Sequence, residues 1–125
     1  MAYGHYMPRK IVPSGYLEPV RSAGAKRTLV NVFGTPRARK WSVPAGGSKA
    51  GLRAAQLQHE IAMRLRDAIE ASDAGNPSEL VRRHNGITYD RLRGILSGDV
   101  WMRLEDVAEL AAFLKVKPVV SFEDH

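Results

Sequence analysis

The sequence predicts a mainly α-helical fold of four to five helices, preceded by a basic N-terminal arm that contains a β-hairpin. Three observations lead to this prediction. Apolar residues recur every three or four positions over residues 52–72 and again from Leu104 to Leu114. Between these segments, residues 76–98 carry the start and stop signals of two short helices. The excess of positive charge lies in the first 48 residues.

Length and composition favour one domain with an arm. The chain has 125 residues, of which 44% are hydrophobic, and it has no cysteine. Disulfides and thiolate metal sites are therefore excluded. The apolar runs are too short to span a bilayer, and Pro8, Pro13 and Pro19 interrupt any signal-peptide core. We expect a cytoplasmic protein with no membrane partner.

The net charge of +6 favours an anionic partner. Residues 1–48 hold eight lysines and arginines against one acid, Glu18, which gives +7. Residues 49–125 hold eleven against twelve acids, which gives −1. Nucleic acid is the expected partner, and the alternative is a basic tail that serves solubility.

Residues 1–50 are expected to form the arm. Two β-prone runs, 26–33 and 40–44, flank a Gly/Pro loop and predict a β-hairpin over residues 26–44, with Phe33 and Trp41 as anchors where it docks. Its cations are either a basic finger on DNA or ordinary charges of a solvated turn. The candidate DNA contacts of this region are Lys26, Arg27, Arg37, Arg39 and Lys40.

A glycine-rich joint, residues 45–51, separates the arm from a second unit, residues 51–125. The first helix is predicted over residues 52–72. Its apolar stripe consists of Leu57, Ile61, Leu65, Ala68 and Ile69.

Two short helices and a longer one are predicted next. Asn76 is a favourable cap for a helix that runs to about His84, and Thr88 caps a helix over residues 89–97 that Gly98 ends. The last helix opens at Leu104 and ends before Pro118. The apolar tail beyond it is either a dimer contact or a clasp over the core.

Residues 57–117 resemble the phage-repressor-like (Cro/XRE-like) helix-turn-helix family. The matching residues are Glu79-Leu80, Gly86-Ile87-Thr88, Leu92, Ile95-Leu96-Ser97-Gly98, Leu104-Glu105, Leu110-Ala111, Leu114 and Val116. The resemblance implies a lambda-repressor-like domain of four or five helices, whose recognition helix 89–97 enters the major groove, usually as a homodimer. The step from Leu80 to Gly86 is one residue longer than in the family, with Asn85 as the extra residue.

The candidate site residues fall into two groups. The expected base-reading residues are Thr88, Tyr89, Asp90 and Arg93, with Arg93 suited to guanine and Asp90 either accepting from cytosine or paired with Arg91 or Arg93. The expected phosphate-binding residues are Asn76, Ser78, Arg82, Arg83, Arg91, Ser97 and Arg103. For Arg82 and Arg83 the alternative is a solvated helix face.

These residues favour a DNA-binding transcription regulator, such as a repressor of bacterial or phage origin, with double-stranded DNA as partner. The alternatives are an antitoxin-like or adaptor module whose residues 1–50 bind a partner protein, and a non-specific binder that uses charge alone. No catalytic set is present, and the four histidines lack metal-ligand spacing. We expect no cofactor, no metal and no enzyme activity.

Overall fold

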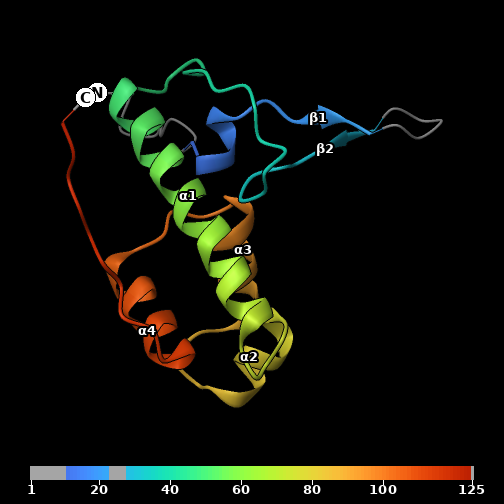
Figure 1. Cartoon of the computed structure of the whole chain (residues 1–125). Helices are drawn as coiled ribbons and strands as arrows, with labels where there is room; N and C mark the ends of the chain where they lie inside the picture. Colours follow the sequence, from blue (N-terminus) through green and yellow to red (C-terminus); the bar gives the residue numbers. More distant parts are fainter. Residues whose placement is uncertain (1–10, 23–27, 125) are drawn as a thin grey trace, which may run out of the picture.

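The computed structural model describes residues 11–22 and 28–124, and the fold is given for these residues. It contains four α-helices, a short 3-10 helix and a two-stranded antiparallel sheet, so the predicted mainly helical class is confirmed. In chain order the elements are η2 (Pro13–Tyr16), β1 (Val20–Arg21), β2 (Leu29–Val30), α1 (Lys49–Ala71), α2 (Pro77–Arg83), α3 (Tyr89–Ser97) and α4 (Leu104–Leu114) (Figure 1).

Helix α1 is the long element on which the other parts of the core pack. Ser48 caps it by accepting a hydrogen bond from the Gly51 amide at 2.9 Å, and the helix therefore begins before the predicted Leu52. The expected core stripe is wrong at Leu57, which is 63% exposed. The buried residues of α1 are Ala55, Gln58, His59, Ala62, Leu65 and Ile69. The apolar periodicity placed Leu57 on the predicted buried side of α1. In the structure, η2 and α3 pack instead on the side that carries the small residues Ala55 and Ala62.

The three shorter helices lie close to their predicted bounds because their caps are local. The Asn76 side chain accepts from the Glu79 amide at 2.9 Å at the start of α2. Thr88 does the same for α3, and Gly98 ends α3 in the left-handed conformation with φ 75°. Helix α4 begins at Leu104, as expected.

The predicted hairpin over residues 26–44 is wrong in its pairing. Strand β2 pairs with the upstream strand β1, with Val20 opposite Val30. Trp41, from the expected second strand, instead forms an isolated antiparallel bridge with Leu17. Figure 1 shows that the β1–β2 ribbon projects away from the helices.

The core explains this pairing. Phe33 is 1% exposed, and the Gly34 amide donates a 2.8 Å hydrogen bond to His59 Nδ1, so the chain after β2 is fixed on α1. The Phe33 and Trp41 rings both contact the His59 ring edge-on, with centroids 5.5 and 5.3 Å apart. Phe33 and Trp41 are therefore the anchors, as expected for a docked segment. The stretches around Tyr16 and Phe33 therefore belong to the core and are not a free arm, whereas the β1–β2 ribbon between them projects from it.

Tyr16 also packs in the core. Tyr16 is 4% exposed and contacts the Trp101 ring at 6.3 Å, so it packs in the interior. Tyr3 and Tyr6, the other tyrosines of residues 1–50, lie outside the described residues.

None of the helices in the described ranges combines the length and the apolar composition that crossing a membrane requires.

Candidate nucleic-acid interface

Helix α3 has one buried side and one exposed side. Leu92, Ile95 and Leu96 are at most 2% exposed and fix the buried side against the core. The four predicted base-reading residues, Thr88, Tyr89, Asp90 and Arg93, are all solvent-exposed. Residues three and four positions apart lie next to each other on a helix, so Tyr89 and Asp90 both neighbour Arg93 on one strip. The strip lies over the first half of the helix, where a base-reading helix makes its contacts.

The charges on this strip are not neutralised within the described chain. Neither Asp90 nor Arg93 forms an ion pair with any residue in the ranges 11–22 and 28–124. The expected alternative, a salt bridge from Asp90 to Arg91 or Arg93, is therefore wrong for these residues. The reason is that Arg91 turns to the opposite side of α3. A carboxylate and a guanidinium remain available three residues apart on the exposed side.

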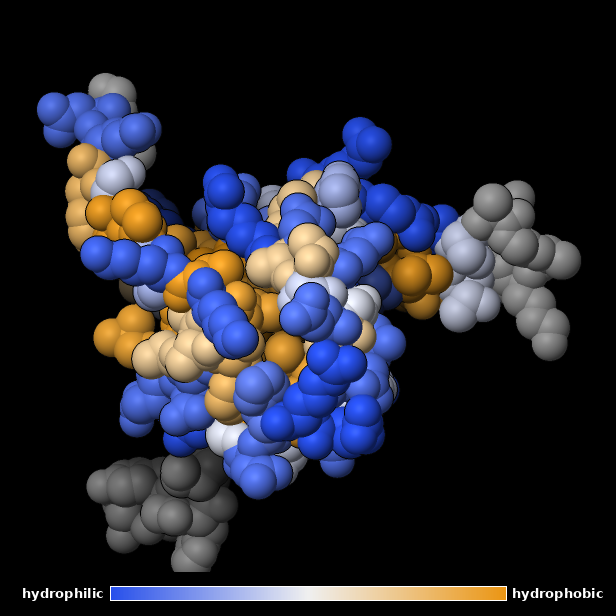
Figure 2. Space-filling model, turned by 60° about the horizontal axis from the view of Figure 1, so that its bottom comes forward, coloured by the Kyte–Doolittle hydropathy of each residue, from blue (hydrophilic) through white to orange (hydrophobic). Residues whose placement is uncertain are grey.

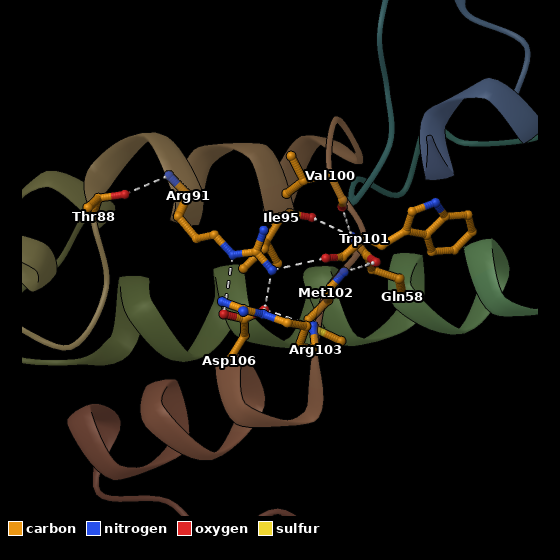
Figure 3. Close-up of polar contacts among 9 residues, drawn as sticks. All are labelled: Gln58, Thr88, Arg91, Ile95, Val100, Trp101, Met102, Arg103 and Asp106. Atoms are coloured by element: carbon orange, nitrogen blue, oxygen red, sulfur yellow. Dashed lines mark hydrogen bonds and ion pairs between the residues drawn. The ribbon is translucent and has the colours of Figure 1, made fainter. Parts of the chain in front are cut away.

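Arg91 is partly buried and points into the junction of α3 and α4. Its Nη2 lies 2.6 Å from Asp106 Oδ2 and donates to the Trp101 carbonyl at 3.0 Å, while its Nε donates to Asp106 Oδ1 at 3.3 Å (Figure 3). Three of its five guanidinium donors are used in this way, so its position does not favour the expected phosphate contact. The pair joins α3 to α4 and to the loop between them.

Asp106 is nearly buried, at 5% exposure, yet its carboxylate stays in the charged form. Burial raises the pKa of Asp106, but this effect is outweighed by hydrogen bonds from the Arg91 guanidinium and the Arg103 amide and by the charges of both arginines. The net pKa lies below its usual value. The Arg103 amide donates at 2.7 Å, so Asp106 also caps the start of α4. The exposed Arg103 guanidinium lies 3.7 Å from the same carboxylate.

Gln58 provides a second fixed contact between α1 and α3. Its Nε2 donates to the carbonyls of Ile95 and Val100 at 3.1 and 3.0 Å, and its Oε1 accepts from the Met102 amide at 2.7 Å (Figure 3). The residue is 3% exposed, both of its amide protons are donated, and its side-chain oxygen accepts one hydrogen bond. Sequence reasoning missed this residue. The signal available in the sequence was its spacing of four residues from Ala62, which places both side chains on the same side of α1.

The candidate phosphate contacts on α2 are exposed, but two of them already have a partner. Arg82 donates to Glu79 at 2.6 and 2.7 Å, and Arg83 donates to the same carboxylate at 3.2 Å. These hydrogen bonds, the one from Arg82 first, lower the pKa of Glu79 to about 2. The Asn76 side-chain oxygen is used as the helix cap, and Ser78 is exposed at the first turn.

Ser97 ends the candidate strip. Its hydroxyl lies 2.8 Å from the Arg93 carbonyl and 3.0 Å from the Asp99 carboxylate, so its single proton has an acceptor within the chain. This position does not favour the expected phosphate contact.

The candidate cations before α1 are surface residues where the structure describes them. Arg37 and Arg39 are exposed, and Lys40 lies 3.5 Å from Glu18. Lys26 and Arg27 lie outside the described residues. The Asn31 amide group donates to the Ser97 carbonyl at 3.0 Å, which places the start of this segment at the C-terminal end of α3, about 12 Å from Tyr89 along the helix.

The described residues include no group of three or more histidine, cysteine, aspartate or glutamate side chains that could hold a metal ion. A shallow cavity of about 500 Å³ lies between the α2–α3 turn and the start of α4, with Thr88 and Arg103 on its wall. Thr88 belongs both to this cavity and to the exposed strip of α3.

Searches of protein-family models, curated proteins and solved structures found no match to the chain.

Proposed function

We propose that this protein is a sequence-specific DNA-binding transcription regulator whose α2–turn–α3 unit is a lambda-repressor-like helix-turn-helix, with α3 in the major groove. The observation that carries the proposal is the two-sided character of α3. Tyr89, Asp90 and Arg93 are exposed on one side. On the other side, Arg91 and Gln58 fix the helix by hydrogen bonds.

A fixed helix suits base recognition because bidentate contacts need side chains held in one orientation. Arg93 is suited to guanine O6 and N7 in the major groove, and Asp90 to the N4 amino group of cytosine. Asp90 also opposes non-specific binding, since an unpaired carboxylate beside phosphates is repelled. The presence of one cation and one acid on the same exposed strip favours recognition of a base sequence over attraction by charge alone.

Attraction to the DNA backbone is assigned to other residues. Arg103 and Ser78 are exposed beside the ends of α3 and α2, and Arg82 and Arg83 exchange their contacts with Glu79 for phosphate oxygens. Arg37, Arg39 and Lys40 add long-range attraction to the duplex from the basic N-terminal segment.

The alternative, in which residues 1–50 wrap a partner protein, has less support. The described part of this segment already uses Leu17, Val32 and Phe33 in the core of its own chain. Those side chains are not free for a partner.

The test is selection of duplexes from a random library with the full chain, followed by titration of a selected and a shuffled duplex over a salt series. The Arg93→Ala variant should lose about 1–3 kcal/mol on the selected duplex and relax the preference at one base position. The Arg82→Ala variant should weaken both duplexes alike. Arg53 is an exposed cation on α1, so Arg53→Ala is the matched control. It should change neither the affinity for either duplex nor the base preference. Selection that enriches no sequence would reject the proposal.

A further inference from the structure

An apolar groove runs between α1, α4 and the chain that follows α4. It has a volume of about 710 Å³, and its walls include Leu57, Ile61 and Ala68 from α1 and Val107 from α4. In Figure 2, hydrophobic surface gathers on this side of the molecule, at the base of the C-terminal segment that stands away from the body. The side chain of Leu57 is large and 63% exposed, so the groove leaves apolar surface in contact with water.

The C-terminal tail, residues 116–124, forms one edge of this groove and is itself exposed. Val119, Val120 and Phe122 are 84%, 77% and 96% exposed. Within the described part of the chain, residues 117–124 take part in no hydrogen bond and no ion pair. An extended segment with unpaired backbone groups and apolar side chains is a template for pairing with another strand.

The tail has the alternation of a half-buried strand. Successive side chains of an extended chain point to opposite faces. The even-numbered face is apolar throughout and consists of Val116, Pro118, Val120 and Phe122. The odd-numbered face carries Lys117 near one end and Glu123 near the other, with Val119 and Ser121 between them.

We propose that the tail pairs with the tail of a second copy of this chain, antiparallel, and that the paired tails cover both apolar grooves. The sequence of the tail is complementary to itself in one register. A two-fold axis at Val120 places Lys117 of each copy opposite Glu123 of the other, which gives two opposite-charge pairs. With Val120 at a non-hydrogen-bonded position, Pro118 is at one too, so its missing amide proton removes no ladder hydrogen bond.

A second copy satisfies the tail better than its own groove does. Folding of the tail onto its own helices would cover Phe122 but give the exposed backbone donors and acceptors of residues 117–123 no partner except water. Pairing with another tail uses those groups and covers the apolar face as well. A stable interface needs about 800 Å² from each partner, and one aromatic side chain supplies about 150–250 Å² of this. Phe122, Val120, Leu57 and the strand backbone are the parts of each copy that contribute to this area.

This proposal stands whether or not the chain binds DNA. Its test is sedimentation of the full chain over a dilution series, in which the wild type should be a dimer. Lys117→Glu and Glu123→Lys each place like charges opposite one another twice, and each should weaken dimerisation on the order of tenfold. An equimolar mixture of these two variants restores both opposite-charge pairs and should form heterodimers as strong as the wild-type dimer.

Two further variants complete the test. Phe122→Ser should weaken dimerisation on the order of a hundredfold, because one large apolar side chain is lost from each copy. Glu105→Lys, a charge reversal at an exposed position of α4, is the matched control and should leave the dimer unchanged. Circular dichroism should show the wild-type helix content for all variants, since the substituted side chains in the tail are exposed.

Three results would overturn the proposal. The first is a wild type that remains a monomer over the whole dilution series. The second is a monomer that Phe122→Ser destabilises toward urea, because the tail would then be a clasp on its own groove. The third is a mixture of Lys117→Glu and Glu123→Lys that associates no better than either variant alone, because the register would then be wrong.

Discussion

Replacing Asp106 with alanine should destabilise the junction of α3 and α4 by about 2–4 kcal/mol. The Asp106 side chain is 6% exposed and accepts from Arg91 at 2.6 Å and from the Arg103 amide at 2.7 Å. Removing one partner of a buried ion pair costs about 3–5 kcal/mol. Arg91 is 26% exposed and keeps the Trp101 carbonyl, so solvent and this acceptor reduce the loss. The lost cap of α4 adds about 0.5–2 kcal/mol.

The assay is urea unfolding of the full chain at neutral pH, followed by circular dichroism and by tryptophan fluorescence. Glu105→Ala is the matched control, because Glu105 is an exposed acid in the same turn of α4. The control should lose at most about 0.5–1 kcal/mol, which is the typical effect of one acid on the helix dipole. If Asp106→Ala lost no more than the control, the interpretation of Asp106 as the fixed point between α3 and α4 would be refuted.

The same residue predicts a pH dependence. The pKa of Asp106 is lower in the folded chain than its ordinary value of 3.8, so the unfolded state binds more protons between the two values. The stabilisation is therefore complete above about pH 4 and is lost as the pH falls through the folded pKa. The difference in unfolding free energy between the wild type and Asp106→Asn should shrink over this range. A difference that is constant with pH would contradict the assignment.

Three other substitutions test how the rest of the domain is held together. Gln58→Leu should cost about 2–3 kcal/mol in urea unfolding, because it leaves a buried amide and two carbonyls without their partner; a loss under about 0.5 kcal/mol would contradict this. Burial lowers the pKa of His59 below 6.5, so its neutral form stabilises the fold above that pH, and this stabilisation is lost as the pH falls below 6.5. His59→Gln should reduce the change of the unfolding free energy with pH in this range, and an unchanged pH dependence would be evidence against this role. Gly98→Ala should destabilise the folded state by about 2–4 kcal/mol, since the position has φ 75° and an added Cβ would lie 2.7 Å from the Phe33 ring. An unchanged thermal unfolding temperature would exclude this clash.

The sequence predicted the helices well because their ends depend on nearby residues. A capping side chain and its amide are three residues apart at Asn76 and Thr88, the two caps that were predicted. Such contacts can be recognised from the order of residue types alone. The exposed strip of α3 followed from the same periodicity.

The contacts that orient α3 could not be predicted in this way. Arg91 and Asp106 are 15 residues apart, and Gln58 and Met102 are 44 apart. Nothing in the local sequence specifies such partners, because they depend on how the helices pack. The buried side of α1 was misplaced for the same reason. The N-terminal segment that covers it was expected to be an arm, whereas Phe33 and Trp41 attach it to His59.

The extra residue in the α2–α3 turn is the main departure from the family that the sequence resembles, and its position bears on the proposed function. Asn85 is exposed, while Ile87 after it is 9% exposed and still packs in the core. Before it, His84 stacks on Phe113 with ring centroids 4.4 Å apart. Both ends of the turn are thus fixed, and the added residue lies at the surface. Under the proposed function, the added residue would alter the outline of the α2–α3 turn, while α3 stays fixed by Leu92, Ile95 and Leu96 in the core.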